Sequence, residues 1–368
     1  QGSVLTASEY DPMGRLQKQS SINAASKAQG PVQREYAYDQ FGNLSQLIDG
    51  NHETRFIYDL VNRLEHVESN DPNTQERFDF DPASNLVSMD SGDGAEAHNS
   101  NSSTSHGNRL SMQGDRHFTY DERGNLICEK RGKGGKLVTT FDYNLNNQLT
   151  SVTKDGQRTD YRYDPLGRRI EKRDTFGSTR YLWAGDQLVQ EQRGEMKKTY
   201  IYEPESFKPV ALIQDGELYH YHLDHLGTPK ELSNEQGKVV WKARYKAYGN
   251  LALKEVEEVE NNLRFQGQYF DEETGLHYNR HRYYNPNTGQ FTTQDPIGLL
   301  GGVNNYQYAA NPIGWVDPLG LSCKESKPYS PNSKPNFYLG PAGPAATMPS
   351  TAYRYDRYLN DNGTSNEW

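Results

Sequence analysis

The sequence has fewer apolar residues than a compact protein of its size would bury. Only 33% of its 368 residues are hydrophobic, and the mean hydropathy is −0.98. No apolar stretch approaches the ~20 residues that a transmembrane helix needs. A chain of this length would ordinarily bury a thick aliphatic core. We therefore expect neither a membrane span nor a conventional globule.

Cysteine and clustered positive charge are also scarce. Cys128 and Cys323 lie far apart in the sequence and form no C-x-x-C motif, so no disulfide framework is indicated, although a single disulfide stays open. The net charge is −9 and is spread without long runs. A nucleic-acid surface would show clustered Lys and Arg. We expect no nucleic-acid partner for the main body of the chain, and we expect no cofactor.

The residues that are abundant suit β-structure. Aromatic residues make up 11% of the chain, with 26 Tyr, and there are 33 Gly. Tyr and Phe pack well on a pleated surface, and Gly, Asn and Asp serve tight turns. This composition predicts a thin, extended sheet with two wet faces.

A short motif recurs along the first half of the chain, at spacings of 20 to 28 residues in its clear copies. Each copy has an aromatic residue, then Asp or Asn, then a turn, then an apolar or basic residue. The copies begin at Tyr10, Tyr38, Tyr58, Phe80, Tyr120, Tyr143 and Tyr163, with a weak copy at 107–110. Such a period indicates a repeat architecture.

Each copy predicts a β-hairpin. Residues such as Tyr36 and Tyr38 alternate along a strand and share one face. The Asp that follows can bond the backbone ahead of it, while Gly or Asn takes the positive-φ position. A leucine such as Leu44 then opens the returning strand. Because one hairpin alone is marginally stable, the hairpins must stack.

These units are YD repeats, and residues 1–321 resemble the carboxy-terminal part of an Rhs/YD-repeat polymorphic toxin, a family that includes the insecticidal toxin-complex C subunits. In that family the repeats spiral into a cocoon that encloses a toxin. The resemblance implies a mainly β fold of stacked antiparallel β-hairpins that form part of a hollow spiral shell. With this number of repeats, we expect the closing end of a cocoon, or a piece that dimerises.

The pattern changes after residue 215. His220, His222 and His225 stand near Asp224 in a segment that resembles the entry to the Rhs-associated core domain. Histidines on one strand face can hold zinc, but no second ligand pair with convincing spacing follows. We interpret them as hydrogen-bonding neighbours of the strands, and expect no metal site.

The end of this core segment resembles the self-cleaving site of the family. Arg282, Asp295 and Asp317 fall on the family's catalytic positions, and the resemblance implies cleavage between Leu321 and Ser322. Two neighbouring carboxyls cannot both ionise cheaply, so one can donate a proton while the other activates water. Arg282 would hold one carboxylate ionised through a bidentate pair. The sequence does not say which aspartate takes which role.

The residues around the cut favour a tight turn. Pro318 and Gly320 would fold the chain back past Asp317, which makes the reaction intramolecular, with a large proximity advantage. The alternative is that these Asp-Pro pairs are ordinary turns that cap strands, with the chain left intact.

The composition shifts again after Leu321. Proline recurs from Pro328 to Pro349, which is typical of extended, linker-like chain. Residues 322–368 are too few for an ordinary enzyme domain, so we expect the start of a truncated, variable toxin domain. Arg354 is loosely similar to an NAD-holding Arg of ADP-ribosyltransferase toxins; a nuclease is the other toxin activity considered.

The sequence thus predicts a YD-repeat shell in 1–215, an Rhs-associated core with an aspartyl autoprotease in 216–321, and a linker with the toxin start in 322–368. Such a protein would be a secreted or delivered bacterial effector. Its partners would be its own toxin as cargo, an immunity protein, and a type VI secretion apparatus or toxin complex. The alternatives are a non-enzymatic, teneurin-like structural or cell-surface binding protein and carbohydrate binding by the aromatic faces.

Overall fold

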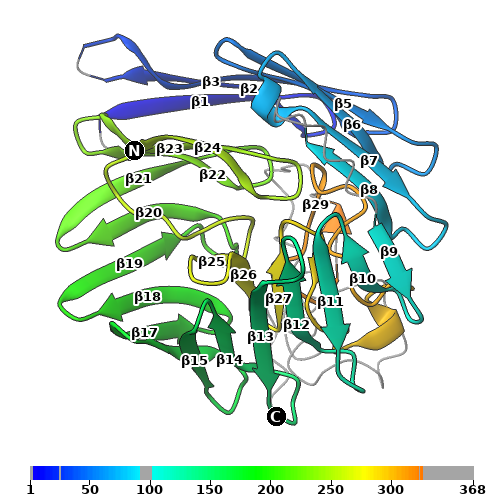
Figure 1. Cartoon of the computed structure of the whole chain (residues 1–368). Coiled ribbons are helices and arrows are strands. Elements are labelled where there is room, and N and C mark those ends of the chain that lie inside the picture. Colours follow the sequence, from blue (N-terminus) through cyan, green and yellow to red (C-terminus); the bar gives the residue numbers. More distant parts are fainter. Residues whose placement is uncertain (1–2, 25, 92–101, 323, 326–368) are drawn as a thin grey trace, which may run out of the picture.

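The computed structural model describes residues 3–24, 26–91, 102–322 and 324–325. Two large sheets carry the repeats, and every strand in them pairs antiparallel with its neighbours in the sequence (Figure 1). The first sheet consists of β1 (Val4–Tyr10), β2 (Leu16–Asn23), β3 (Gln29–Tyr38), β4 (Leu44–Asp49), β5 (His52–Tyr58), β6 (Leu64–Ser69), β7 (Glu76–Phe80) and β8 (Leu86–Ser91). The second consists of β9 (Ser102–Ser105), β10 (Arg109–Gln113), β11 (Arg116–Tyr120), β12 (Leu126–Arg131), β13 (Leu137–Tyr143), β14 (Leu149–Lys154), β15 (Gln157–Tyr163), β16 (Arg169–Asp174), β17 (Gly177–Ala184), β18 (Gln187–Arg193), β19 (Met196–Tyr202), β20 (Pro209–Gln214), β21 (Glu217–Leu223), β22 (Pro229–Asn234), β23 (Val239–Tyr245) and β24 (Leu251–Glu257).

The remaining elements are short. They are the inner sheet of β25 (Tyr269–Asp271), β26 (Leu276–Asn279), β27 (Arg282–Asn285) and β28 (Gln290–Phe291), the pair β29 (Trp315–Val316) and β30 (Lys324–Glu325), and the 3₁₀ turns η1 (Pro72–Thr74) and η2 (Gly298–Leu300). None of the helical segments among the described residues is long and apolar enough to cross a membrane.

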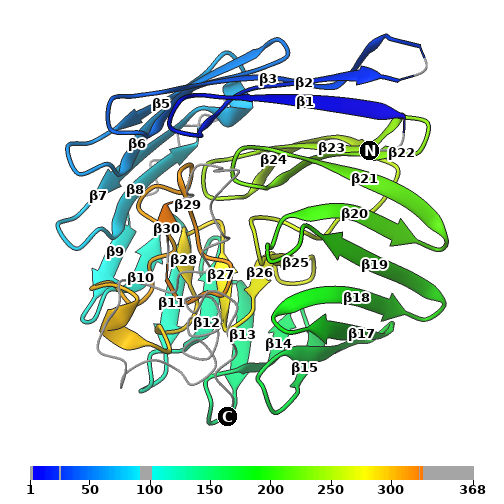
Figure 2. The same cartoon turned by 180° about the vertical axis from the view of Figure 1, so that it is seen from behind.

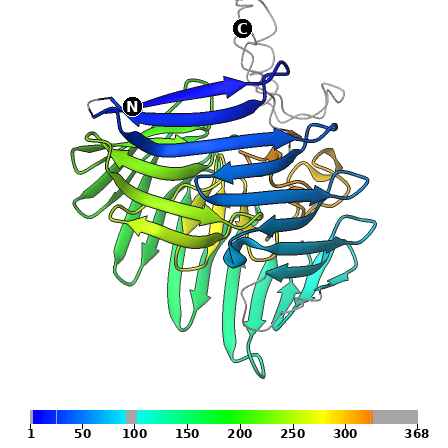
Figure 3. The ribbon, with the colours of Figure 1, turned by 90° about the horizontal axis from the view of Figure 1, so that it is seen from above.

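The two large sheets curl into a shell. Their strands wind round until β22–β24 lie beside β1–β3 (Figures 1 and 2), and the view from above shows the first sheet lying across the end of the second (Figure 3). The seam is polar: the Ser3 amide donates to the Glu235 carbonyl oxygen at 3.0 Å, and the buried Arg34 pairs with the buried Glu231. The predicted mainly β fold, with stacked hairpins forming part of a spiral shell, is confirmed.

The repeat tyrosines tie successive hairpins together. The Tyr58 hydroxyl donates to the Leu44 carbonyl oxygen at 2.8 Å, and the Tyr163 hydroxyl donates to the Leu149 carbonyl oxygen at 2.7 Å. In both cases the acceptor opens the second strand of the preceding repeat. The recurring Tyr of the motif therefore has a physical reason: its ring is partly buried against the core cluster and its hydroxyl is satisfied by the preceding repeat.

One expectation about the faces of the sheet was wrong. The sequence predicted two wet faces, but the concave face of the second sheet is lined by buried apolar and aromatic residues that continue into Tyr269, Tyr278 and Tyr283 of the inner sheet. The inner sheet lies inside the curl of the shell (Figure 2). Low overall hydrophobicity hid this core because the apolar residues are confined to alternate positions of each strand.

The change of architecture comes after Glu257, where β24 ends and the chain turns inward. The predicted boundary at 215 falls inside the second sheet, between β20 and β21, which pair continuously. The division at 215 was drawn from motifs and stays a prediction about sequence families.

Candidate cleavage site

Three short elements bring the predicted catalytic residues together. Arg282 begins β27, Asp295 begins a turn shortly after β28, and Asp317 follows β29 directly. All three side chains are buried. Residues that are far apart in the sequence thus meet inside the shell, against the inner sheet.

The Arg282 guanidinium lies at the centre of this arrangement. Its Nη2 is 2.8 Å from Asp295 Oδ2 and 3.7 Å from Asp317 Oδ2. Its Nε donates to the Gly320 carbonyl oxygen at 2.5 Å, and its carbon Cζ lies 3.6 Å from the centre of the Phe291 ring. One fixed cation therefore contacts both carboxyls and the turn before the predicted cut.

The predicted cleavage segment is a tight turn, as expected. The Gly320 amide donates to the Asp317 carbonyl oxygen at 3.3 Å, and Gly320 has φ +69°, which favours glycine. Asp317 Oδ1 accepts the Leu321 amide at 2.9 Å and the Ser322 amide at 3.2 Å. The Asp317 carboxyl therefore lies beside the nitrogen of the Leu321–Ser322 peptide.

The neighbouring backbone fits closely around this turn. A Cβ at position 320 would meet the Asn279 carbonyl oxygen at 2.6 Å, and a Cβ at position 267 would collide with Pro318. The Asn279 side-chain amide donates to the Asp317 carbonyl oxygen at 2.9 Å. Glycine at 267 and 320 is therefore required for the chain to pass here.

The other carboxyl faces the opposite end of the same peptide. A Cβ at position 301 would collide with both Asp295 Oδ2 and the Leu321 carbonyl oxygen. Both oxygens therefore lie close to the Gly301 backbone. Asp295 Oδ1 accepts the Ile297 amide at 3.0 Å, which fixes the carboxyl. The Leu321–Ser322 peptide thus has Asp317 at its nitrogen and Asp295 near its carbonyl oxygen.

Both carboxyls resist ionisation. Burial raises the pKa of Asp295 to about 6, although the charge of Arg282 and the Ile297 amide oppose the shift. Burial also raises the pKa of Asp317, against Arg282 and the amides of the turn. Asp317 Oδ2 is buried and has no hydrogen-bond partner among the described residues. Such a pair suits acid and base chemistry.

A small cavity lies beside Arg282. The cavity of 130 Å³ is lined in part by Arg282, Thr293 and Pro296, next to Asp295. It has room for a few water molecules and polar walls to hold them.

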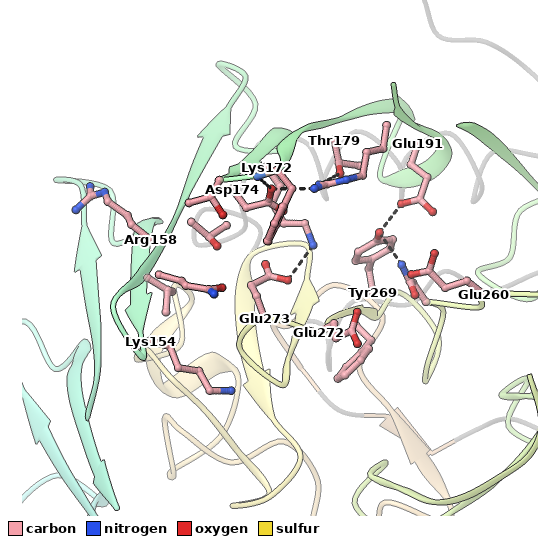
Figure 4. Close-up of a pocket in the computed structure, with 18 of the residues that line it drawn as sticks. Lys154, Arg158, Lys172, Asp174, Thr179, Glu191, Glu260, Tyr269, Glu272 and Glu273 are labelled. Atoms are coloured by element: carbon pink, nitrogen blue, oxygen red, sulfur yellow. Dashed lines mark hydrogen bonds and ion pairs between the residues drawn. The ribbon is translucent and has the colours of Figure 1, made fainter. Parts of the chain in front are cut away.

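A larger cavity lies elsewhere on the inner wall. It has a volume of 610 Å³ and is lined by charged side chains from β14–β19 and by the chain around β25 (Figure 4). Three of its cations are paired: Lys172 contacts Glu273 at 3.0 Å, Lys198 contacts Glu260 at 2.8 Å, and Arg193 contacts Asp174. The cavity is therefore a boundary between shell and inner sheet that is bridged by ion pairs.

The candidate metal ligands lie apart. The His222 ring is hydrogen-bonded to the Ser233 hydroxyl at 2.8 Å, and His225 Nε2 to the Ile313 carbonyl oxygen at 2.8 Å. His222 is on β21, whereas Asp224 and His225 lie in the turn after it, where Asp224 accepts the Leu226 amide. Within the described ranges no three His, Cys, Asp or Glu side chains gather as a metal site would require.

Sequence reasoning missed the residues that shape the backbone of the site. Asn279, Gly267 and Gly301 act through close contacts that no local motif encodes. Arg354, the proposed toxin residue, lies outside the described residues, whereas Leu321 and Ser322 lie within them.

Known proteins share this arrangement of repeats. The family model described as Teneurin YD-shell matches residues 2–313. The double-stranded DNA deaminase toxin A of Burkholderia cenocepacia is 36% identical over 88% of this chain and 25% of its own length. The probable deoxyribonuclease RhsA of Dickeya dadantii is 31% identical over 85% of this chain and 22% of its own length.

This chain belongs to the Rhs/YD-shell family. A solved structure of the Tc holotoxin pore of Photorhabdus luminescens shares its fold, with a TM-score of 0.70 and 19% identity over 90% of this chain and 18% of that chain. The predicted family is therefore confirmed. The chain spans about a quarter of the curated relatives it matches, so the activities in their names belong to those whole proteins.

Proposed function

We propose that this YD-shell segment cuts its own chain between Leu321 and Ser322. The observation that carries the proposal is the placement of two buried carboxyls on one peptide: Asp317 lies at the Ser322 nitrogen and Asp295 lies near the Leu321 carbonyl oxygen. Arg282 contacts both carboxyls. An ordinary pair of Asp-Pro turns would not require a shared buried guanidinium.

The geometry supports an assignment of roles that the sequence left open. Asp317 accepts two amide hydrogen bonds, which favour its ionised form although burial raises its pKa, and its Oδ2, which lies 3.7 Å from Arg282 Nη2, can take a proton from water. Asp295 has a pKa of about 6, so it can be protonated and donate to the Leu321 carbonyl oxygen. Asp317 is then the base and Asp295 the acid.

Hydrolysis of the Leu321–Ser322 peptide needs only these two carboxyl groups and one water molecule. The water oxygen bonds to the Leu321 carbonyl carbon while Asp317 takes a water proton and Asp295 donates to the carbonyl oxygen. As the carbon–nitrogen bond breaks, Asp317 passes its proton to the Ser322 nitrogen, and the new carboxyl returns a proton to Asp295. The products are a carboxyl group at Leu321 and an amine at Ser322.

The proposal extends to the whole protein as a delivered toxin. The shell would enclose the residues that follow Ser322 as cargo, and the cut would free them inside it. The relatives named as toxins support an effector role with a toxin cargo. An immunity protein, a secretion apparatus or toxin complex, and the cargo's own activity remain predictions from the sequence.

A non-enzymatic shell is the second candidate, because the matching family model is named for teneurins. The two candidates differ in one observable, the integrity of the chain.

The test is the pattern of bands on a denaturing gel after folding. Wild-type chain should give two fragments, and Asp295→Asn and Asp317→Asn should each give one full-length band. Asp11→Asn is the matched control, since Asp11 begins an Asp-Pro-x-Gly turn of the shell, and it should cut like wild type. An intact wild-type chain would favour the non-enzymatic shell.

A further inference from the structure

In most repeats the residue that opens the returning strand is leucine, but in one repeat it is not. Leu16, Leu44 and Leu149 occupy that position in other repeats, but the repeat that begins at Tyr163 has Arg169. The Arg169 side chain is only 1% exposed, at the start of β16. A charge at a core position needs a partner.

Arg169 finds its partner across the boundary between shell and inner sheet. Its Nη1 lies 2.5 Å from Asp271 Oδ2 and its Nη2 lies 3.0 Å from Asp271 Oδ1, a bidentate pair on β25. Asp271 has no exposed side-chain surface. Five tyrosine rings surround the guanidinium at 4.5 to 5.8 Å from its carbon: Tyr161, Tyr181, Tyr269, Tyr278 and Tyr283.

Lys172 and Glu273, which line the 610 Å³ cavity, lie beside this pair. Lys172 lies 3.3 Å from Asp271 Oδ1 and 3.0 Å from Glu273 Oε2, and Figure 4 shows the Lys172 side chain directed toward Glu273. The Tyr161 hydroxyl donates to Glu273 Oε1 at 3.0 Å. The shell residues Lys172 and Tyr161 therefore pack around the ion pair and also bind Glu273, which follows β25.

Arg169 also holds the two strands next to the cleavage site. Its backbone amide donates to the Tyr278 hydroxyl at 3.0 Å, and its Nη1 donates to the Tyr283 hydroxyl at 3.2 Å. Tyr278 and Tyr283 are direct partners across β26 and β27, and the next pair is Asn279 with Arg282.

Neighbouring residues on a strand point to opposite faces. The tyrosine pair faces the shell, so the Asn279–Arg282 pair faces the cleavage turn, where Arg282 contacts both carboxyls and Asn279 binds the Asp317 carbonyl oxygen. The turn between the strands is anchored as well, because Arg280 Nε lies 2.7 Å from Asp186 Oδ1.

We propose that Arg169 is a positioning residue for self-cleavage: from the shell wall, it sets the β26–β27 hairpin and thereby the place of Arg282 at the scissile peptide. This inference rests on the proposed function. It makes cleavage conditional on a completed wall, because the repeat that carries Arg169 must be in place before the inner sheet is fixed.

The test compares two equally buried arginines. Arg169→Lys keeps the charge but loses the bidentate fork. Arg34→Lys makes the same change in the buried Arg34–Glu231 pair at the seam, which does not touch the inner sheet. Uncut chain held in urea is diluted to start folding, and the cleavage rate constant is measured across a pH series.

We expect Arg169→Lys to cut about 10 to 100 times more slowly than wild type, with a displaced pH midpoint because Arg282 no longer holds Asp295 in the same geometry. Arg34→Lys should keep the wild-type rate and midpoint. Tyr283→Phe removes only the hydroxyl that Arg169 contacts, and should slow cleavage in the same direction.

Several results would overturn the inference. One is a wild-type rate and midpoint in Arg169→Lys, or in Tyr283→Phe if the lysine variant does not fold. Another is an equal loss in both arginine variants, which would indicate general destabilisation. If the wild-type chain never cuts, the proposed function fails and the inference fails with it; if wild type cuts, only the inference is at stake.

Discussion

In the shell turn that begins at Asp11, the fifth residue, Arg15, places its guanidinium on the carboxylate that began the turn. Arg15 Nε lies 2.6 Å from Asp11 Oδ2, while Oδ1 accepts the Met13 and Arg15 amides. The turns that begin at Asp59 and Asp164 repeat this arrangement with arginine, at 2.6 and 2.7 Å. Other shell turns use asparagine, as when Asn125 donates to Asp121.

The two closing turns keep the pattern and change its fifth residue. Both read Asp-Pro-Ile/Leu-Gly-Leu, from Asp295 to Leu299 and from Asp317 to Leu321, with glycine at positive φ in fourth place. Leucine offers no partner to the second carboxylate oxygen, and Arg282, from a distant strand, contacts both carboxyls instead.

The pKa of the aspartate that begins the turn shifts in opposite directions in the two regions. Burial opposes ionisation of Asp11, but the Arg15 hydrogen bonds and charge outweigh it and lower the pKa of Asp11. Burial prevails over Arg282 at the cleavage site and raises the pKa of Asp295 to about 6. A turn of the shell type thus becomes a site for proton transfer when it lacks the arginine or asparagine in fifth place and the turn is buried.

Removing the shared guanidinium should have the largest effect. Arg282→Leu leaves two buried carboxyls without their cation, and cleavage should slow by about 100 to 1000 times. Arg282→Lys should fall in between, because a lysine cannot contact both carboxyls and the Gly320 carbonyl oxygen as a planar fork does. Time courses on denaturing gels measure this, and a wild-type rate in Arg282→Leu would break the comparison.

The raised pKa of Asp295 should appear as a pH-dependent loss of stability. Its folded pKa, about 6, lies above the ordinary value of 3.8, so the folded state binds the proton more tightly. Stability should therefore fall as pH rises from about 4 to above 6.

Urea unfolding of uncut Asp317→Asn chain, compared with Asp295→Asn/Asp317→Asn, isolates this effect. A shift from 3.8 to about 6 corresponds to about 3 kcal/mol, and because the charge of Asp317 contributes to that shift, the difference between the free energies of unfolding of the two variants should change by less than this across that pH range. A difference that does not vary with pH would show that Asp295 titrates normally.

Placing an arginine in the fifth position of a closing turn should give its aspartate the properties of a shell-turn aspartate. Leu299 is 76% exposed, so Leu299→Arg can be accommodated and can bring a second guanidinium to Asp295. This should lower the pKa of Asp295 and slow cleavage about tenfold at neutral pH, because less of the acid is protonated. Leu299→Met is the control, and equal rates in the two variants would contradict the idea.

The converse change in the shell should have the smallest effect. Arg15→Leu removes the partner of Asp11 and a cation–π contact with Tyr38 at 4.6 Å, which should cost about 1 kcal/mol at neutral pH. Because the folded pKa of Asp11 is lowered, the ion-pair part of this contribution should vanish as pH falls through that value, while the cation–π part remains. Thermal unfolding in the Asp317→Asn background measures it, and cleavage in the otherwise wild-type chain should not change.

The shell was predictable from the sequence because its rule is local. Asp, a glycine or asparagine three residues later, and a flanking tyrosine determine each hairpin, so the repeat could be recognised without knowing its neighbours. The aspartates at 295 and 317 were predictable only through the family resemblance. In isolation they read as two more turns.

The remaining features depend on contacts between distant segments. Gly301 and Asn279 serve the site through backbone contacts that their neighbours in the sequence do not signal. Arg169 did leave a signal, a charge in a leucine position, but its partner Asp271 is about a hundred residues away. The apolar cluster on the concave face was missed because its residues are spread thinly over many strands.

The central claim is that Asp295 and Asp317 hydrolyse the Leu321–Ser322 peptide, and cleavage in ¹⁸O-labelled water tests it most directly. Mass spectrometry should find an N-terminal fragment that ends at Leu321 with one ¹⁸O in its new carboxyl group, and a second fragment that begins at Ser322. An intact chain would contradict the account. So would a break at Asp295–Pro296 or Asp317–Pro318, since Asp-Pro bonds break in acid without any catalytic site.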